Sequence, residues 1–203
     1  MARHTGPKSR MSRRVGTRLF PKDEKIFTKR NFPPGIHGAA SRRRISGYGH
    51  QLLEKQKAKW MYGVLEKQFR GYYKKAAKKH GQTGSILLQL LETRLDNTVF
   101  RLGFATTRPQ ARQLVSHGFI EVNGKKVSIP SYQVKVGDQI SIRESKAKSK
   151  NIENLKTIIL KAQPPEWLQL DPRALSGRVL SVPARETLDA TINPQLIIEH
   201  YSR

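Results

Sequence analysis

The sequence predicts an α+β fold in which helices precede a small antiparallel β segment. Apolar residues recur every three or four positions from Ser85 to Leu102, as they do on one face of an amphipathic helix. Farther along, Asn123-Gly124 separates the short runs Ile120–Val122 and Lys125–Val127, and both residues of this pair tolerate the positive φ of a two-residue hairpin turn. A chain of 203 residues with 36% hydrophobic residues supports two small lobes with modest cores.

Residues 1–47 form a different kind of segment. They mix Arg, Lys, Gly, Pro and Ser with almost no periodic apolar pattern, so they cannot bury enough apolar surface to offset their conformational entropy. We therefore expect a basic N-terminal extension that is largely disordered when free and takes its shape on a binding partner.

Residues 48–80 have a helical composition, and we expect two helices that end at Gly81. Leu53, Trp60 and Val64 share an apolar stripe, which turns the basic residues outward. These basic residues are Lys55, Lys59, Lys67, Arg70, Lys74, Lys75, Lys78 and Lys79. Such faces can hold phosphate groups.

Tyr72 and Tyr73 lie in the second of these helices. They could stack on unpaired bases, but a tyrosine in a helix more often packs against its neighbours. The sequence leaves both roles open.

The segment Ser85–Leu102 is predicted to be one amphipathic helix that Gly103 terminates. The same geometry places Arg94, Asn97 and Arg101 on its polar face. We expect Asp96 to orient a nearby arginine.

A second helix should begin at Arg108-Pro109, because proline suits the first helical position, and end at Gly118. Its polar face carries Arg108, Arg112, Gln113, Ser116 and His117. After the Asn-Gly hairpin, apolar residues from Val134 to Ile142 alternate with a period of two, which predicts another hairpin-like pair of strands.

The net charge indicates the class of partner. Lys and Arg number 39 against 15 Asp and Glu, for a formal charge of +24, and the basic excess is 11 in residues 1–50, 6 in 51–100, 7 in 101–150 and zero in 151–203. Such an excess needs an anionic partner, either nucleic acid or an anionic membrane surface. No apolar run is long enough to cross a bilayer, and the N-terminus lacks a secretory signal. We therefore expect that the anionic partner is not a membrane.

Patterns typical of catalysis are weak. The chain has no cysteine, and its six histidines are scattered without ligand spacing. The stretch from Gly118 to Lys125 fails the phosphate-loop pattern. We therefore expect that the protein is not an enzyme and has no small-molecule substrate. His117 is interpreted as an RNA contact or a helix C-terminal partner rather than a general base.

Phosphate attraction alone does not separate RNA from DNA. The chain shows no dimeric half-site arrangement, and an Arg-rich arm beside a compact basic module suits an irregular RNA junction better than a uniform duplex. We therefore favour RNA.

Many short blocks occur in one order along the chain. Those in the middle are Leu90-Leu91-Glu92, Arg94-Leu95-Asp96-Asn97, Thr107-Arg108, Ala111-Arg112-Gln113-Leu114-Val115, His117-Gly118, Val122-Asn123-Gly124, Ile129-Pro130-Ser131-Tyr132 and Gly137-Asp138. Those outside it are Thr5-Gly6-Pro7, Pro34-Gly35, His37-Gly38, Glu54-Lys55-Gln56-Lys57, Tyr62-Gly63, Glu66-Lys67-Gln68-Phe69, Ile192-Asn193, Leu196-Ile197-Ile198-Glu199 and Tyr201-Ser202. Together they resemble small-subunit ribosomal protein four of the bacterial type, over nearly the whole chain.

The resemblance implies a mostly helical first domain, residues 48–86 and 184–203, interrupted by a helix-helix-hairpin RNA-binding domain, residues 87–183. The sequence agrees, because Asn193 and Pro194 can start a last helix whose apolar side needs a host. By resemblance the chain is a structural constituent of the cytoplasmic or an organellar ribosome. It would bind small-subunit ribosomal RNA early and help nucleate assembly of the subunit body. Contact with ribosomal protein five and a role in translational accuracy are also implied.

The residues expected to bind ribosomal RNA combine the polar faces with the matched blocks. They are Arg3, Lys8, Arg10, Arg13, Arg14, Tyr48, Lys55, Lys59, Arg70, Lys74, Arg94, Arg101, Arg108, Arg112, Gln113, His117, Asn123, Lys125 and Lys126. Among them, Arg94, Arg108, Arg112, Lys125 and Lys126 should grip phosphates at one junction. Arg42, Arg43 and Arg44 match a region near the channel through which messenger RNA enters.

One departure from the family concerns a metal. Many members carry four cysteines in the N-terminal extension and bind a structural zinc. Here Ser9 and Ser12 stand in place of the first pair, and the segment between Phe20 and Asn31 that would hold the second pair is shortened. Serine is a poor zinc ligand, so we expect no zinc, no other cofactor, and an extension ordered by RNA alone.

Overall fold

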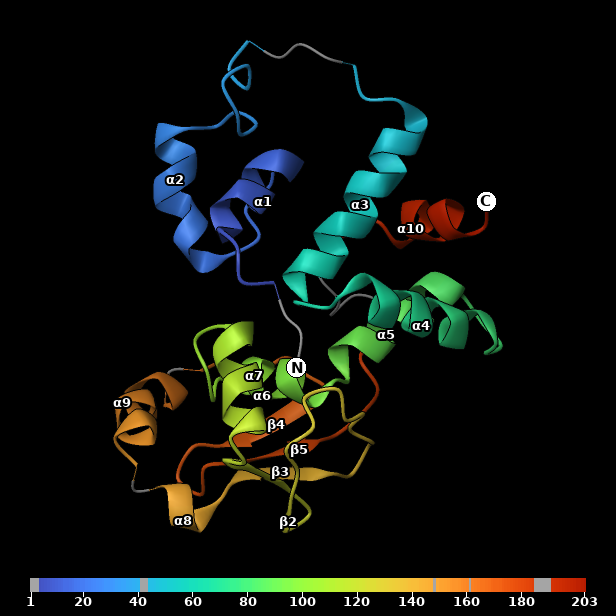
Figure 1. Cartoon of the computed structure of the whole chain (residues 1–203). Helices are drawn as coiled ribbons and strands as arrows, with labels where there is room; N and C mark the ends of the chain where they lie inside the picture. The colour runs from blue at the N-terminus through green and yellow to red at the C-terminus, as the bar shows by residue number, and fades with distance from the viewer. Residues whose placement is uncertain (1–3, 41–43, 148, 161, 185–190) are drawn as a thin grey trace. The chain divides into compact units, whose positions relative to one another are not determined.

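The computed structural model describes residues 4–40, 44–147, 149–160, 162–184 and 191–203 (Figure 1). The chain divides into two compact units, Met1–Leu87 with Asp189–Arg203, and Leu88–Leu188. The corresponding boundaries predicted from the sequence are at residues 86 and 184.

The N-terminal segment of the first unit contains regular structure: helix α1 (Lys8–Val15), the 3-10 helix η1 (Pro21–Asp23) and helix α2 (Glu24–Lys29). The Asp23 carboxylate, only 1% exposed, accepts hydrogen bonds from Ser12 Oγ and from the backbone N–H groups of Leu19, at 3.2 Å, and Phe20, at 2.9 Å. Residues 4–40 thus contain short helices that the apolar pattern of the sequence does not predict. A buried polar cluster, which apolar periodicity does not reveal, joins α1 to η1.

Helices α3 (Gly47–Met61) and α4 (Glu66–Ala77) are the two helices predicted for residues 48–80. Ser46 caps α3 by accepting a hydrogen bond from Gly49 N–H at 3.2 Å. Helix α4 starts with Glu66, an acidic residue that suits the positive end of a helix dipole.

The last helix, α10 (Pro194–Tyr201), packs along α3 and so has the host that its apolar side requires (Figure 1). Asn193 caps it, as predicted, by accepting a hydrogen bond from Gln195 N–H at 3.0 Å. The Tyr201 ring stacks on Tyr73 with centroids 4.7 Å apart, and Tyr72 is buried. Both α4 tyrosines therefore pack in the unit.

Helix α5 (Thr83–Glu92) and helix α6 (Leu95–Arg101) replace the single helix predicted from Ser85 to Leu102. Arg94 has an extended backbone and forms a β-bridge with Gln133. Its successors donate backbone hydrogen bonds outside the helix: Leu95 N–H to Tyr132 O at 2.8 Å and Asp96 N–H to Pro130 O at 3.2 Å. A distant segment thus satisfies the first donors of α6 and breaks a helix that the apolar spacing predicts as continuous.

Helix α7 (Arg108–Ser116) begins with proline in its first turn, as predicted. Thr107 caps it by accepting a hydrogen bond from Gln110 N–H. Strands β1 (Ile120–Val122) and β2 (Lys125–Lys126) follow, with Val122 opposite Lys125. The turn residues Asn123 and Gly124 have φ values of 51° and 73°.

Strand β3 (Gln139–Ile142) belongs to a five-stranded antiparallel sheet of order β2-β1-β3-β5-β4, whose last members are β4 (Leu168–Asp171) and β5 (Ser176–Val179). The period-two pattern from Val134 to Ile142 is therefore a strand only in its second half. Asp138 accepts a hydrogen bond from Lys135 N–H at 2.8 Å and closes a turn in the first half. Ile140 of β3 therefore does not pair with the Val134 end of this pattern but with Gly177 of β5.

Helices α8 (Glu144–Ala147) and α9 (Lys150–Ile159) precede β4 in the chain. Neither these helices nor β4 and β5 are predicted from the sequence. Within the described residues no helix is long and apolar enough to cross a membrane.

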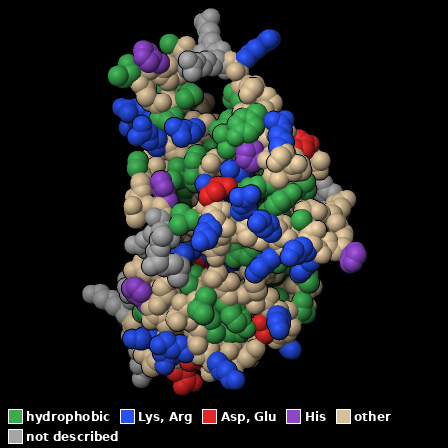
Figure 2. Space-filling view, turned by 45° about the vertical axis from the view of Figure 1, so that its right-hand side comes forward, with side chains coloured by type: hydrophobic (Ala, Val, Ile, Leu, Met, Phe, Trp, Pro, Cys, Tyr) green, Lys and Arg blue, Asp and Glu red, His purple; other side chains and the backbone are tan. Residues whose placement is uncertain are grey.

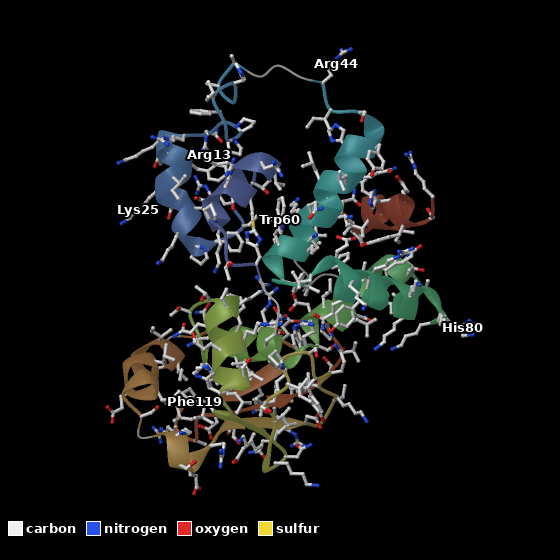
Figure 3. The ribbon with its side chains drawn as sticks, viewed as in Figure 1. Arg13, Lys25, Arg44, Trp60, His80 and Phe119 are labelled. Atoms are coloured by element: carbon white, nitrogen blue, oxygen red, sulfur yellow. The ribbon has the colours of Figure 1, made fainter. Side chains whose placement is uncertain are left out.

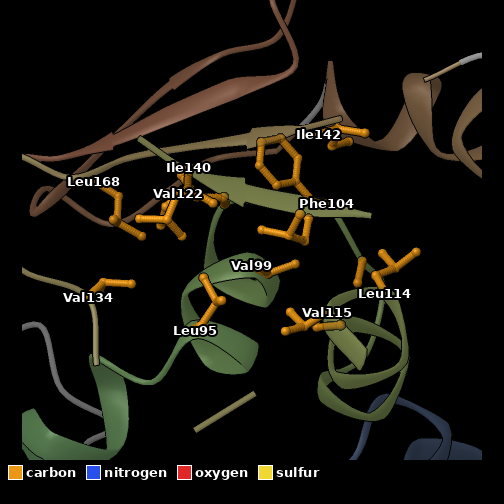
Figure 4. Close-up of a cluster of buried hydrophobic side chains, with 14 of the residues drawn as sticks. Leu95, Val99, Phe104, Leu114, Val115, Val122, Val134, Ile140, Ile142 and Leu168 are labelled. Carbon is orange, nitrogen blue, oxygen red and sulfur yellow. The ribbon is translucent and has the colours of Figure 1, made fainter. Parts of the chain in front are cut away.

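The core of the second unit lies between α6, α7 and the sheet (Figure 4). Leu95 and Val99 from α6 and Val115 from α7 face Ile140 and other apolar residues of the strands, and all four are fully buried. This core fixes the two helices against the sheet.

Replacing Ile140 by Ala should lower the free energy of unfolding by about 2–5 kcal/mol, because it opens a cavity at the centre of this core. Urea denaturation measures the change. Ile129, which is 58% exposed, is the matched control, and Ile129→Ala should change stability by less than about 0.5 kcal/mol. Equal effects would mean that Ile140 is not in the core.

Candidate nucleic-acid interface

Basic side chains are spread over the visible face of the protein with few acidic ones between them (Figure 2). In the second unit, α6, α7 and the β1–β2 hairpin carry several of them, and Lys135, Lys146, Arg173 and Arg178 are exposed elsewhere. Lys125, Lys126, Gln113 and His117 are exposed, as a surface that binds a large anion requires. Arg101 of α6 and Arg108 and Arg112 of α7 are half-buried.

Arg94 does not belong to this surface. It is fully buried, and its guanidinium makes two hydrogen bonds with Asp96, from Nε at 3.0 Å and from Nη2 at 2.7 Å. Asn97 is also buried. Placing Arg94 and Asn97 on a polar face was wrong because the helix ends before Arg94, which changes the direction of every later side chain.

Asp96 also holds an arginine of α7. Arg112 Nη1 donates to Asp96 Oδ2 at 3.3 Å, and the Arg112 side chain is 15% exposed. The prediction that Asp96 orients an arginine is therefore confirmed. One carboxylate joins the start of α6 to the middle of α7.

Glu92, at the end of α5, holds a second group of polar side chains. Arg101 donates to it from Nε at 3.0 Å and from Nη2 at 2.7 Å. Asn97 Nδ2 donates to the same carboxylate at 2.7 Å, while Asn97 Oδ1 accepts from Arg108 Nε at 2.8 Å. The Arg108 guanidinium lies over the Phe100 ring at 4.8 Å. A connected network thus reaches from α5 to α7.

The hairpin lies next to the end of α7. The Lys126 side chain passes so close to Gly118 that a Cβ on this glycine would meet Lys126 Cε at 2.6 Å. The Asn123 side chain stabilises the turn. Its Nδ2 donates to Asp138 Oδ1 at 2.8 Å, and its Oδ1 accepts from Gln139 N–H at 2.9 Å. The structure therefore brings Lys126 and α7 together and gives Asn123 a structural role.

In the first unit, Glu66 binds two of the lysines expected to contact RNA. Lys55 Nζ and Lys59 Nζ donate to it at 3.1 and 3.0 Å, and Tyr201 O–H donates at 2.7 Å. Lys55 is buried, so this side chain stabilises the unit rather than facing a ligand.

The same contacts shift the titration of Glu66 and Tyr201. Burial acts to raise the pKa of Glu66, but the hydrogen bonds from Tyr201, Lys59 and Lys55 outweigh it and lower this pKa from 4.5 to about 2. Burial and the bond to Glu66 raise the pKa of Tyr201. The carboxylate therefore stays ionised and ties α10 to α3 and α4.

The exposed cations of α4 are better placed for an anionic ligand than Lys55. Arg70 and Lys74 are exposed as expected, and Lys67, Lys75 and Lys78 are exposed too. These last three were assigned outward faces but no binding role. The spacing of Lys67, Arg70, Lys74 and Lys78 by three, four and four residues could have identified them as one helical face.

Lys8, Arg10 and Arg14 are exposed near α1, whereas Arg13 donates from Nε to Phe32 O at 2.9 Å and lies over the Phe32 ring. Arg13 therefore fastens residues 32–33 to α1 (Figure 3). Partial desolvation of its ammonium group and the nearby Lys22 lower the pKa of Lys8.

Tyr48 is half-exposed, with its ring 5.4 Å from that of His200 and 5.9 Å from the Arg203 guanidinium. Arg44 is exposed (Figure 3), while Arg3, Arg42 and Arg43 lie outside the described residues.

The residues near Ser12 do not fit a zinc ion. Ser12 Oγ donates to Asp23, the chain has no thiolate to offer, and in the described part of the chain no three His, Asp or Glu side chains lie close enough to share a metal.

The chain matches the ribosomal protein S4/S9 N-terminal domain over residues 3–92 and the S4 domain over residues 93–140. It is 53% identical to small ribosomal subunit protein uS4 of Roseiflexus castenholzii and 54% identical to that of Acidobacterium capsulatum. It is 52% identical to the protein of the same name from Thermoanaerobacter pseudethanolicus. All three alignments cover 100% of both chains.

Replacing Asp96 by Ala should cost about 3–5 kcal/mol of stability, because it removes the carboxylate that pairs with the buried Arg94 charge. Urea denaturation is the measurement. The double variant Arg94→Met/Asp96→Ala, which removes the buried charge as well, should be less destabilised than Asp96→Ala alone. A double variant that is as unstable as the single one would contradict this account.

Glu66→Gln should destabilise the protein in a pH-dependent way. Since the pKa of Glu66 is lower in the folded chain, its contribution is present in full above pH 4.5 and is lost as the pH falls toward about 2. The difference in unfolding free energy between wild type and Glu66→Gln, from urea titrations at several pH values, should therefore shrink over this range. A difference that stays constant would show that the carboxylate is not held by these bonds.

Proposed function

The chain belongs to the S4 family of bacterial small-subunit ribosomal proteins, and from this membership we propose that it binds small-subunit ribosomal RNA directly. Its relatives are named as ribosomal proteins and not as enzymes, so the chain is a structural constituent of the small ribosomal subunit. Direct binding to RNA goes beyond this assignment, and its support comes from the residues of the chain itself.

The observation that carries the proposal is the surface formed by α6, α7 and the hairpin. It presents Arg101, Arg108, Arg112, Lys125 and Lys126 from three elements that one core holds rigidly. Arginine forks bind phosphate oxygens in pairs, while exposed lysines add charge without demanding one geometry. A rigid surface of both kinds suits a folded RNA with phosphates at fixed places.

The exposed face of α4 supports a second contact. Lys67, Arg70, Lys74 and Lys78 follow one another along one side of this helix, so they can meet successive phosphates of one strand. The basic residues of α1 add a third group of cations.

Further roles follow from family membership and are also proposals. We propose that the chain binds early, helps nucleate assembly of the subunit body, contacts ribosomal protein five and contributes to translational accuracy. We place Arg44, with Arg42 and Arg43, near the channel through which messenger RNA enters. The protein would act without zinc, since Ser12 is engaged with Asp23.

A direct test is filter binding of the full chain to a fragment of small-subunit ribosomal RNA containing a multi-helix junction. Duplex DNA at the same salt concentration is the competitor, because affinity for any polyanion falls with salt. The RNA should bind far more tightly than the DNA. Equal competition would reject specific RNA recognition, and absence from the small subunit in sedimented extracts would reject the ribosomal assignment.

Lys126→Glu should weaken binding to this fragment about tenfold or more, because it replaces an exposed cation by an anion beside the phosphates. Arg173→Glu is the matched control. It makes the same change of charge at an exposed turn between β4 and β5 and should have a clearly smaller effect. If both variants lose the same affinity, the hairpin is not part of the binding surface.

A further inference from the structure

Glu92 occupies a position that its own charge disfavours. It is only 1% exposed, and it is the last residue of α5, where the helix dipole repels an anion. A surface that binds phosphate would also gain from losing this negative charge. Some other interaction must therefore account for an acid at this place.

The interaction is with the arginines of the proposed RNA-binding surface. Arg101 meets the Glu92 carboxylate with two hydrogen bonds, at 3.0 and 2.7 Å. Asn97 connects the same carboxylate to Arg108 through bonds of 2.7 and 2.8 Å. Both guanidiniums are thus held by one buried group, while the Arg101 side chain remains 22% exposed.

We infer that Glu92 is a positioning residue for RNA binding, which fixes the guanidinium of Arg101 directly and that of Arg108 through Asn97. This inference rests on the proposed function. A free arginine side chain loses much rotamer entropy when it binds a phosphate. A guanidinium held by a buried carboxylate has lost that freedom during folding, so less is lost on binding.

The Phe100 ring completes the arrangement on Arg108. The guanidinium lies 4.8 Å from the ring centroid, which restricts its plane, while Asn97 fixes the direction of Nε. Two independent contacts therefore define one orientation. This favours recognition of phosphates at defined places over attraction to any polyanion.

If Glu92 has this role, removing its charge should change the affinity for RNA in the direction opposite to the one that net charge alone predicts. Removing an acid from a protein that binds RNA raises its net charge and should strengthen binding at long range. If Glu92 positions the two arginines, Glu92→Gln must instead weaken binding. The control is Glu153→Gln, which removes an exposed carboxylate of α9 and should leave affinity equal or slightly higher.

The experiment measures the affinity of the full chain for the ribosomal RNA junction fragment at several salt concentrations, at a temperature where circular dichroism shows each variant folded. Glu92→Gln should bind about five- to tenfold more weakly with an unchanged salt slope, because both guanidiniums remain. The salt slope is the slope of log K against log[salt], and Arg101→Gln should reduce its magnitude by about 0.7–0.9. In an Arg101→Gln/Arg108→Gln background, Glu92→Gln should have almost no further effect, since the groups that it positions are gone.

Glu92→Asp is a second variant that keeps the charge and the fold but withdraws the carboxylate by one methylene. It should also bind more weakly. If Glu92→Gln and Glu92→Asp bind as tightly as wild type, or if Glu92→Gln is equally harmful without the two arginines, the inference is wrong. A wild-type protein that does not bind the fragment would instead reject the proposed function.

Discussion

The buried ion pair between Arg94 and Asp96 organises the second unit. It lies where α5 has ended, α6 begins and the segment around Gln133 passes alongside. The same aspartate reaches Arg112 on α7, so one carboxylate links two helices and the turn that precedes them. Because Arg94 is fully buried, the pair is costly to break from one side, and the geometry of α6 and α7 depends on both partners.

The few acidic residues of this basic chain have a common use. Glu66 binds Lys55 and Lys59, and Asp96 binds Arg94 and Arg112. Glu92 binds Arg101 directly and is linked to Arg108 through Asn97. Where the cation is buried, as Lys55 is, the result is stability. Where it reaches the surface, as Arg101 and Arg112 do, the result is a cation with a fixed direction. Counting positive charges therefore overstates the number of groups that can meet a phosphate.

The N-terminal segment illustrates how a small element can fold without a large core. Asp23 gathers one hydroxyl and two backbone N–H groups in a buried site, and Arg13 ties the following loop to α1. The Ser12–Asp23 and Arg13–Phe32 bonds connect residues that are 11 and 19 positions apart. They explain how α1 and η1 can be joined in a chain that has no cysteine.

The sequence by itself determined the α+β class, the helices α3, α4, α7 and α10 with the Asn193 cap of the last, the Asn-Gly turn, and the basic surface. Each depends on neighbours in the chain: apolar spacing, a capping side chain or a turn residue. Only the tertiary structure decided that residues 85–102 form two helices, that residues 135–138 form a turn and that β4 and β5 complete the sheet. It also decided which predicted cations are engaged, since Arg94 and Lys55 look like their exposed neighbours until their carboxylates are located. In all of these cases the deciding partner is distant in sequence, and local periodicity carries no information about it.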